Sequence, residues 1–326
     1  MKILNLDARE VAAACPMSAC IEEMSRAFAM AAEGKFQSPA RTRLSASSGD
    51  ILVMPSLAMR RKVEGSVKVV SIFPGNRGGI PAITAVVILI DGETGETRAM
   101  LDGRSLTAIR TGAVSGLSCR FLARRDSKRL GVIGAGVQAL EQVRGVVTEV
   151  PGIETVNVFS RHLARSKALA KECERVLGVG AAAAERASDC VKDGDIVVTA
   201  TTSRTPVFDG KSVEAGTHVI AIGSYRPEAR ELDSSLVSRA SIFVDSKEAA
   251  LEEAGDLLIP MSEGMISRGS IKGELSELVL GRRKGRVSSK EITIFKSVGL
   301  ALEDNAAGWL AYRQALATNA GTWADI

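Results

Sequence analysis

The chain has 326 residues, which is more than a single small domain needs and enough for two. Lysine and arginine (42) nearly balance aspartate and glutamate (38), and aromatic residues make up only 4%, so the basic, base-stacking surface of a nucleic-acid-binding protein is not expected. Five cysteines without a C-x-x-C pair, no signal-peptide pattern and no membrane-length apolar run predict a cytoplasmic protein with reduced thiols and with no metal site and no membrane partner.

The first hundred residues are predicted to form an antiparallel sheet with one or two helices. Met24, Phe28 and Ala31 recur at helical spacing within residues 17–32. A turn-forming stretch at 92–96 separates two apolar runs, as the turn of a hairpin does. The expected extended segments are residues 38–44, 51–55, 67–73, 84–91 and 97–101.

The pattern changes in the second part of the chain. A helix is expected over residues 106–120, and short apolar strands then alternate with helices, which predicts a parallel, doubly wound sheet. The alanine run at 181–184 is expected in a small helix or loop. Residues 300–318 are predicted to form one long helix that returns to the first domain. The expected strands are residues 131–133, 155–159, 196–199, 218–222, 242–244 and 292–295.

The fold class that follows is α/β, with a Rossmann domain and a second, discontinuous α+β domain. The Rossmann domain is expected over residues 119–301. Residues 1–118 and 302–326 are expected to form the second domain.

A glycine-rich turn ends the first strand of the Rossmann domain. Gly134, Gly136 and Ala139 follow an apolar run with the spacing G-x-G-x-x-A. This spacing suits a dinucleotide pyrophosphate, which needs a tight turn, close backbone approach and the free N–H groups of a helix start. An ordinary turn between a strand and a helix is the alternative. The expected cofactor contacts are Gly134, Ala135, Gly136, Val137 and Gln138.

The second strand ends at Ser160 and Arg161, where an NAD-specific site usually carries Asp or Glu. A carboxylate would repel the 2′-phosphate of NADP, whereas a hydroxyl and an arginine would accept it. The turn therefore favours NADP(H), with NAD(H) as the alternative. Arg161 could instead cap a helix or point to solvent. Further cofactor contacts are expected after the next two strands, at Thr199, Ala200, Thr201, Thr202, Gly223 and Ser224.

Several stretches outside the glycine turn resemble the ornithine cyclodeaminase/mu-crystallin family. They run from about residue 39 to about residue 305, nearly the whole chain. The resemblance implies a Rossmann domain and a discontinuous domain that forms a homodimer through its sheet. The stretches include Pro39-Ala40-Arg41-Thr42, the Lys68 strand, Thr107-Ala108-Ile109-Arg110-Thr111, Arg230-Glu231-Leu232-Asp233 and Phe295-Lys296-Ser297-Val298-Gly299.

The resemblance implies catalytic roles for three basic residues. Arg41 and Arg110 would bind the substrate carboxylate, because guanidinium pairs with carboxylate through two parallel bonds. Lys68 would lie beside the reacting C=N or C=O group, with a pKa lowered by desolvation and by the two arginines. The other contacts implied are Lys68, Tyr225 and Arg226 with the substrate, and Lys296 and Ser297 with the cofactor through their backbone.

One position departs from the pattern of the cyclodeaminases. Those enzymes carry an aspartate that assists amine chemistry, and Tyr225 takes its place in Gly223-Ser224-Tyr225-Arg226-Pro227. The stretch is closer to the mu-crystallin form, whose members reduce cyclic ketimines. The resemblance thus implies NAD(P)H-dependent reduction of Δ1-pyrroline-2-carboxylate to L-proline, or of piperideine-2-carboxylate. The alternatives are ornithine cyclodeaminase, alanine dehydrogenase-like amination of pyruvate, cis-3-hydroxyproline dehydratase, and a non-catalytic protein that binds NADPH and a small ligand.

His162 and His218 are the two histidines of the chain. His218 is expected in the core or at a sheet edge and His162 at the surface, so no histidine-based triad or metal site is expected. Asp304 belongs to a family-like stretch, and we expect it to cap a helix or to support other side chains.

Overall fold

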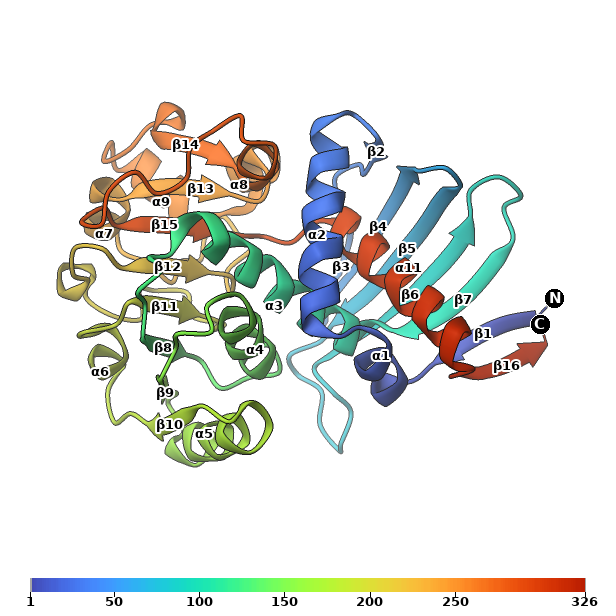
Figure 1. The fold of residues 1–326 in the computed structure, drawn as a ribbon, viewed down its shortest axis with the longest axis horizontal. Helices are drawn as coiled ribbons and strands as arrows, with labels where there is room; N and C mark the ends of the chain where they lie inside the picture. The colour runs from blue at the N-terminus through green and yellow to red at the C-terminus, as the bar shows by residue number, and fades with distance from the viewer. Residues whose placement is uncertain (1, 326) are drawn as a thin grey trace. The chain divides into compact units, whose positions relative to one another are not determined.

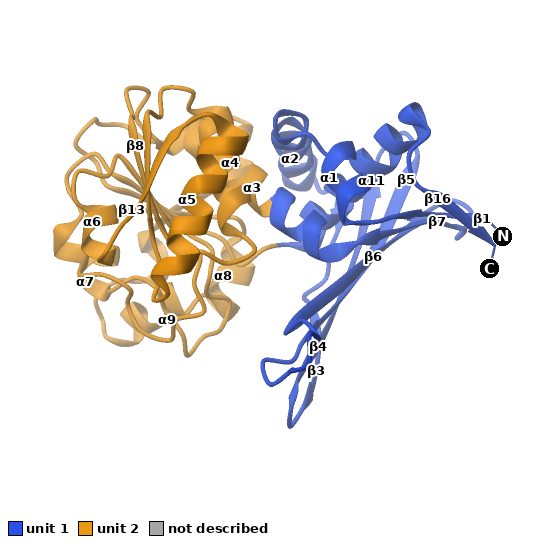
Figure 2. Ribbon diagram, turned by 90° about the horizontal axis from the view of Figure 1, so that it is seen from below, with its two compact units in different colours: residues 1–110, 300–326 blue, residues 111–299 orange. Residues whose placement is uncertain are grey.

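The computed structural model describes residues 2–325, which form two compact units (Figure 2). Unit 1 comprises Met1–Arg110 and Leu300–Ile326, and unit 2 comprises Thr111–Gly299. Unit 1 is therefore discontinuous in the sequence. The first boundary between the units follows Arg110, inside the single helix α3 (Gly103–Leu122), and lies eight residues before the expected one. The sequence could not place it more closely, because a continuous helix carries no sequence signal at the residue where it passes from one unit to the other.

Unit 1 is built on one eight-stranded sheet with the order β16-β1-β7-β6-β5-β4-β2, in which β3 also pairs with β4. Helix α11 packs across β4, β5 and β6 and against α2, so helices cover one face of the sheet (Figure 1). The strands are β1 (Lys2–Leu6), β2 (Phe36–Gln37), β3 (Thr42–Ala46), β4 (Gly49–Met59), β5 (Val63–Ile72), β6 (Ile83–Asp91), β7 (Thr97–Asp102) and β16 (Thr322–Asp325). The helices are α1 (Ala8–Ala14), α2 (Met17–Ala32) and α11 (Ala301–Thr318).

The two faces of this sheet have different surroundings. Lys68 of β5 lies opposite Met54 of β4, and both side chains are buried. Because side chains alternate across a strand, the next residue, Val69, points to the other face, where it lies opposite Val53 and Val86. These three valines are only half-buried. The face that holds Lys68 is therefore covered by helices, whereas the opposite face is apolar and partly exposed.

Unit 2 is a parallel sheet with the order β10-β9-β8-β11-β12-β15-β13-β14, and helices lie on both of its sides (Figure 2). This is the doubly wound sheet that the sequence predicts. The strands are β8 (Arg129–Ile133), β9 (Thr155–Phe159), β10 (Gly180–Ala183), β11 (Ile196–Thr199), β12 (His218–Ala221), β13 (Ser241–Val244), β14 (Ile271–Glu274) and β15 (Thr293–Lys296). The helices are α4 (Ala139–Glu149), α5 (Leu163–Leu177), α6 (Ala187–Val191), α7 (Ser234–Arg239), α8 (Lys247–Glu253), α9 (Gly255–Ser262) and α10 (Leu275–Val279).

Short strands account for most of the differences from the expected elements. The alanine run at 181–184 was expected in a helix or loop, but Gly180–Ala183 form β10, parallel to β9. Alanine favours helices in isolation, and the backbone pairing with β9 overrides that preference. The sequence analysis also missed β1, β2, β14 and β16. No helix in residues 2–325 is both long and apolar enough to cross a membrane.

Candidate active site

The glycine turn after β8 is a tight connection that only glycine can make. Gly134 has a φ of +112°, and a Cβ there would lie 2.4 Å from the carbonyl oxygen of Ala200. Its N–H donates to the carbonyl oxygen of Phe159 at 2.8 Å. Gly134 therefore joins the carboxyl ends of β8, β9 and β11, the edge at which doubly wound sheets bind dinucleotides.

The start of α4 offers space and hydrogen-bond donors that fit a diphosphate. A Cβ added at Gly136 would meet no heavy atom within 4 Å. The N-cap residue, Gln138, makes no side-chain capping bond. Within residues 2–325, no hydrogen bond uses the backbone N–H groups of Gly136, Val137 or Gln138. Unpaired N–H groups at a helix N-terminus attract anions, so these residues suit the pyrophosphate of a dinucleotide.

The turn after β9 presents an arginine and no carboxylate. The Ser160 hydroxyl donates to the carbonyl oxygen of His162 at 2.9 Å and accepts from the His162 N–H at 3.2 Å, so it holds the turn together. Arg161 is exposed, and so is His162, as expected. Nothing at positions 160 and 161 would repel the 2′-phosphate of NADP.

The residues predicted after β11 and β12 direct their side chains into the protein. The hydroxyl groups of Thr199 and Thr201 donate to the carboxylate of Glu231 at 2.9 and 2.8 Å. The hydroxyl of Ser224 donates to the carbonyl oxygen of Ala229 at 2.6 Å. These three side chains are therefore engaged, and a dinucleotide would meet the backbone of their loops. The sequence analysis assigned no role to Glu231.

The residues that end β15 are also buried within unit 2. The Lys296 ammonium donates to the carbonyl oxygen of Ser224 at 2.5 Å and lies 2.9 Å from the carboxylate of Asp256. The Ser297 hydroxyl donates to Asp245 at 2.8 Å. Both side chains are used inside the unit. The Ser297 N–H donates to the carbonyl oxygen of Ala221 at 3.1 Å and the Lys296 carbonyl oxygen accepts from the Asp245 N–H at 3.3 Å, so the expected backbone contact with the cofactor stays a prediction.

Unit 1 brings two of the three predicted catalytic residues to one cluster of buried charges. The Lys68 ammonium lies 2.5 Å from Oδ2 of Asp304. The Arg110 guanidinium reaches Oδ1 of Asp304 through Nε at 3.1 Å and Oε2 of Glu303 through Nη1 at 2.5 Å. Lys68 and Arg110 are 3% and 5% exposed, and both acids are fully buried. β5, α3 and α11 each contribute to this charge cluster, which consists of Lys68, Arg110, Glu303 and Asp304.

Asp304 supports other side chains, as expected, but it does so through the two candidate catalytic residues themselves. Glu303 was not predicted to take part. A sequence signal exists for both, because two adjacent acids interrupt a helix that is otherwise rich in alanine and leucine. Charges on such a helix need partners when they are buried.

The charge cluster shifts the pKa of its own members. Burial lowers the pKa of Lys68 to about 8, the Asp304 carboxylate opposes this fall, and the charges of Arg110 and Arg41 add to it. Burial by itself would raise the pKa of Asp304, but Lys68 and Arg110 together hold it below its usual value. Lys68 is thus poised to exchange a proton near neutral pH, as a general acid or base requires.

The remaining predicted substrate residues lie on less buried segments. Arg41 precedes β3 and is half-buried, and its charge acts on Lys68. Tyr225 and Arg226 belong to unit 2, where the Arg226 guanidinium lies 5.9 Å from the centre of the Tyr225 ring. This contact is within the range of a cation–π interaction.

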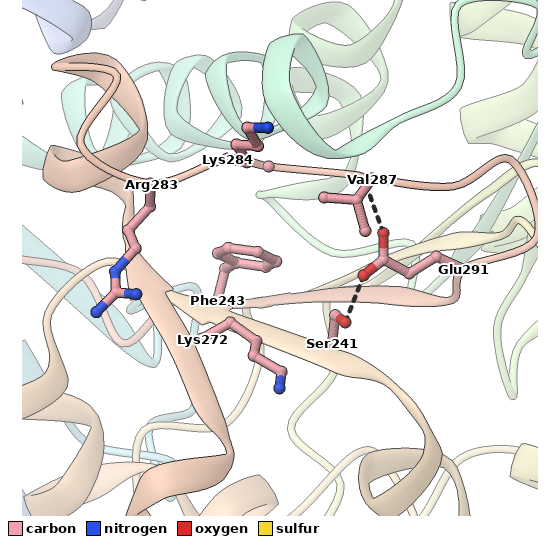
Figure 3. A pocket seen from close by; sticks show the side chains of 8 residues that line it. Ser241, Phe243, Lys272, Arg283, Lys284, Val287 and Glu291 are labelled. Atoms are coloured by element: carbon pink, nitrogen blue, oxygen red, sulfur yellow. Dashed lines mark hydrogen bonds between the residues drawn. The ribbon is translucent and has the colours of Figure 1, made fainter.

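A separate pocket of about 380 Å³ lies in unit 2 (Figure 3). Its lining includes Ser241, which begins β13, and Glu291, which precedes β15, so the pocket is at the amino ends of these strands. Glu291 accepts hydrogen bonds from the Ser241 hydroxyl and the Val287 N–H. Dinucleotides bind at the opposite, carboxyl edge of such sheets, and none of the predicted site residues lines this pocket.

A model of the ornithine cyclodeaminase/mu-crystallin family matches residues 2–319. The chain belongs to this family. The structure of Δ1-pyrroline-2-carboxylate reductase from Thermococcus litoralis, in complex with NADH and L-proline, is 42% identical, covers 98% of this chain and 99% of its own, and has a TM-score of 0.94. An archaeal alanine dehydrogenase dimer with bound NAD is 33% identical, with full coverage of both chains and a TM-score of 0.93.

A third relative is similar in sequence. The Δ1-pyrroline-2-carboxylate reductase of Bacillus cereus (strain ZK / E33L) is 39% identical over 287 residues, which are 87% of each chain. These similarities confirm the family and the fold class that the sequence motifs imply.

Proposed function

We propose that this chain reduces a small cyclic imino acid with a nicotinamide dinucleotide, and that Δ1-pyrroline-2-carboxylate is reduced to L-proline. The observation that carries the proposal is the buried charge cluster of Lys68 and Arg110 in a chain that is 42% identical to a reductase of this type. The bound NADH and L-proline of that relative support the same pair of ligands here.

Unit 1 would hold the imino acid and supply the proton. Arg41 and Arg110 would bind its carboxylate, and the Nη2 amine of Arg110 is used by neither acid of the charge cluster. This places the adjacent C=N carbon in a fixed position. When a hydride adds to that carbon, the electron pair of the C=N bond moves to nitrogen, which takes up a proton from the Lys68 ammonium or from a water that Lys68 orients.

Unit 2 would hold the cofactor along the carboxyl edge of its sheet. The glycine turn at Gly134 and the start of α4 would bind the pyrophosphate, for the reasons of space and free donors given above. The bound nicotinamide would supply the hydride. The solved relatives contain NADH or NAD, which supports NAD(H) as a cofactor of this chain. The sequence analysis favoured NADP(H), whereas these relatives favour NAD(H), and the exposed Arg161 after β9 keeps NADP(H) as the alternative cofactor.

Two further properties are part of the proposal. The apolar, half-exposed face of the unit 1 sheet supports a homodimer formed through that face, and one relative is described as a dimer. The five cysteines are free and buried, which is consistent with a cytoplasmic location, where thiols stay reduced.

Alanine dehydrogenase-like amination of pyruvate is the second candidate, because the archaeal alanine dehydrogenase matches the whole chain. Pyruvate and ammonia form an open-chain imine with a carboxylate beside the C=N carbon, so the same residues would serve it. Ornithine cyclodeamination is less well supported, because Tyr225 replaces the acid that assists amine chemistry in the cyclodeaminases.

One substrate panel tests the proposal. Oxidation of NADH and NADPH is followed with Δ1-pyrroline-2-carboxylate, with piperideine-2-carboxylate, and with pyruvate in the presence and absence of ammonia. We expect the highest kcat/KM with Δ1-pyrroline-2-carboxylate. Ammonia release from ornithine, without oxidation of NADH or NADPH in the presence of any imine, would contradict the proposal. Oxidation of NADH or NADPH only with pyruvate and ammonia would favour the second candidate.

A further inference from the structure

A fully buried carboxylate, that of Glu231, lies where β11 and β12 end. It accepts hydrogen bonds from the Thr199 hydroxyl (2.9 Å), the Thr201 N–H (2.7 Å) and the Thr201 hydroxyl (2.8 Å). It also accepts one from the Gly223 N–H at 2.7 Å. One side chain therefore satisfies donors from the loop after β11 and from the loop after β12.

The two loops that Glu231 joins have little room to move. A Cβ at Gly223 would lie 2.2 Å from the carbonyl oxygen of Thr201 and 2.5 Å from Oε1 of Glu231. The two backbones are thus in direct contact at this point, and the carboxylate fills the space beside them.

Asp256 and Lys296 hold the segment that carries Glu231. Oδ1 of Asp256 accepts from the backbone N–H groups of Glu231 (2.6 Å) and Leu232 (2.9 Å). Its Oδ2 lies 2.9 Å from the Lys296 ammonium, which also donates to the carbonyl oxygen of Ser224 at 2.5 Å. Because Lys296 ends β15, the network connects the carboxyl ends of three neighbouring strands, β11, β12 and β15.

We propose that Glu231 is a positioning residue of the dinucleotide site, which fixes the loops at residues 200–202 and 222–224 against each other so that their backbone meets the nicotinamide half of the cofactor in one arrangement. This inference rests on the proposed function, because it takes the carboxyl edge of the unit 2 sheet as the cofactor site. A carboxylate suits the role since it accepts hydrogen bonds at both oxygens, whereas the amide of glutamine would turn two N–H donors toward donors of the loops.

Glu231→Gln tests the role by direct binding of NADH. The dissociation constant is measured from the fluorescence of bound NADH, in the absence of substrate, and the KM for Δ1-pyrroline-2-carboxylate is measured at saturating NADH. We expect the dissociation constant to rise about 10-fold to 100-fold, because buried donors lose their acceptor. The KM for the imino acid should change less than the dissociation constant of NADH, since Lys68 and Arg110 belong to unit 1 and only Tyr225 and Arg226 of the predicted substrate residues follow the altered loop.

Glu291→Gln is the matched control. Glu291 also accepts two hydrogen bonds in unit 2, but at the amino ends of the strands, so its change should affect the melting temperature and not the affinity for NADH. If Glu231→Gln does not fold, Asp256→Asn takes its place and should weaken NADH binding in the same direction. Unchanged NADH affinity in a folded Glu231 or Asp256 variant overturns the inference. Failure of the unaltered protein to bind NADH or NADPH would instead overturn the proposed function.

Discussion

Lys68 and Asp304 form a buried ion pair in which Nζ and Oδ2 are 2.5 Å apart. The lysine comes from the middle of a sheet strand and the aspartate from the first turn of α11. Because Asp304 also contacts Arg110, one carboxylate sets the positions of both candidate catalytic residues of unit 1. Asp304 is thus placed to keep Lys68 protonated in surroundings that would otherwise favour the neutral amine.

Asp304→Asn should shift the pH profile of imine reduction. The pKa of Lys68 is about 8 because burial outweighs the Asp304 charge, which is the main influence that raises it. Loss of that charge lowers the pKa of Lys68 further. If the reaction needs protonated Lys68, its rate will then begin to fall at a lower pH as the solution is made more alkaline. We expect the alkaline limb of the kcat profile to move down by about one pH unit. The measurement is kcat at saturating imine and NADH across roughly pH 6 to 10, which brackets the Lys68 pKa.

Glu303→Gln is the control for this prediction, because Glu303 contacts Arg110 and is the neighbouring buried acid on the same helix. We expect it to raise the KM for the imino acid through a less well-oriented guanidinium, with the alkaline limb in place. An alkaline limb that does not move in Asp304→Asn would show that Lys68 is not the group that supplies the proton.

The regular elements of both units could be predicted from the sequence, because their apolar patterns have a clear period. Residues 17–32 are the helix α2, and residues 84–91 lie within β6. Short edge strands such as β10 and β14 could not be predicted, since pairing with a neighbour decides their conformation. The charge cluster could be predicted only in part. Family-like motifs pointed to Lys68 and Arg110. Glu303 and Asp304 stand out as adjacent acids in a helix rich in alanine, but no local pattern reveals that this helix packs on the sheet and pairs them with Lys68 and Arg110.

Arg161→Asp should change the choice of cofactor. A carboxylate at the end of β9 would repel the 2′-phosphate of NADP and could bond the ribose hydroxyls of NAD. We expect kcat/KM for NADPH to fall more than about tenfold, while that for NADH stays within about twofold. Lys171→Asp makes a matching charge change at an exposed position of α5 and should leave the ratio of the two cofactors unchanged. Equal effects of Arg161→Asp on both cofactors would contradict a role for Arg161 at the 2′-position.

Val69→Asp should dissociate the proposed dimer. Val69 lies on the half-exposed apolar face of the unit 1 sheet, opposite Val53 and Val86, and a carboxylate buried there without a partner is costly. We expect light scattering coupled to size-exclusion chromatography to give a monomer mass for this variant and a dimer mass for the unaltered chain. Val176→Asp introduces the same change on the exposed surface of α5 and should remain dimeric. A dimer that survives Val69→Asp places the interface elsewhere.

His218 should make the stability of the protein fall in mild acid. It is fully buried, and its ring contacts the hydroxyl groups of Thr293 at 3.0 Å and Ser118 at 3.2 Å. Burial, with the charge of Arg286, lowers its pKa from 6.5 to about 3. The unfolded chain therefore binds a proton at His218 between these values and the folded chain does not. The stabilisation that neutral His218 gives the folded chain is fully present above pH 6.5 and is lost as the pH falls toward 3.

His218→Gln removes this titration and keeps groups that can hydrogen-bond. From pH 7 to pH 5, the unaltered chain should lose about 2 kcal/mol more unfolding free energy than the variant, measured by urea denaturation. His162→Gln changes an exposed histidine and should follow the unaltered chain at both pH values. An identical loss in His218→Gln and in the unaltered chain would mean that His218 already carries a proton in the folded state, and would require a counter-charge beside its ring.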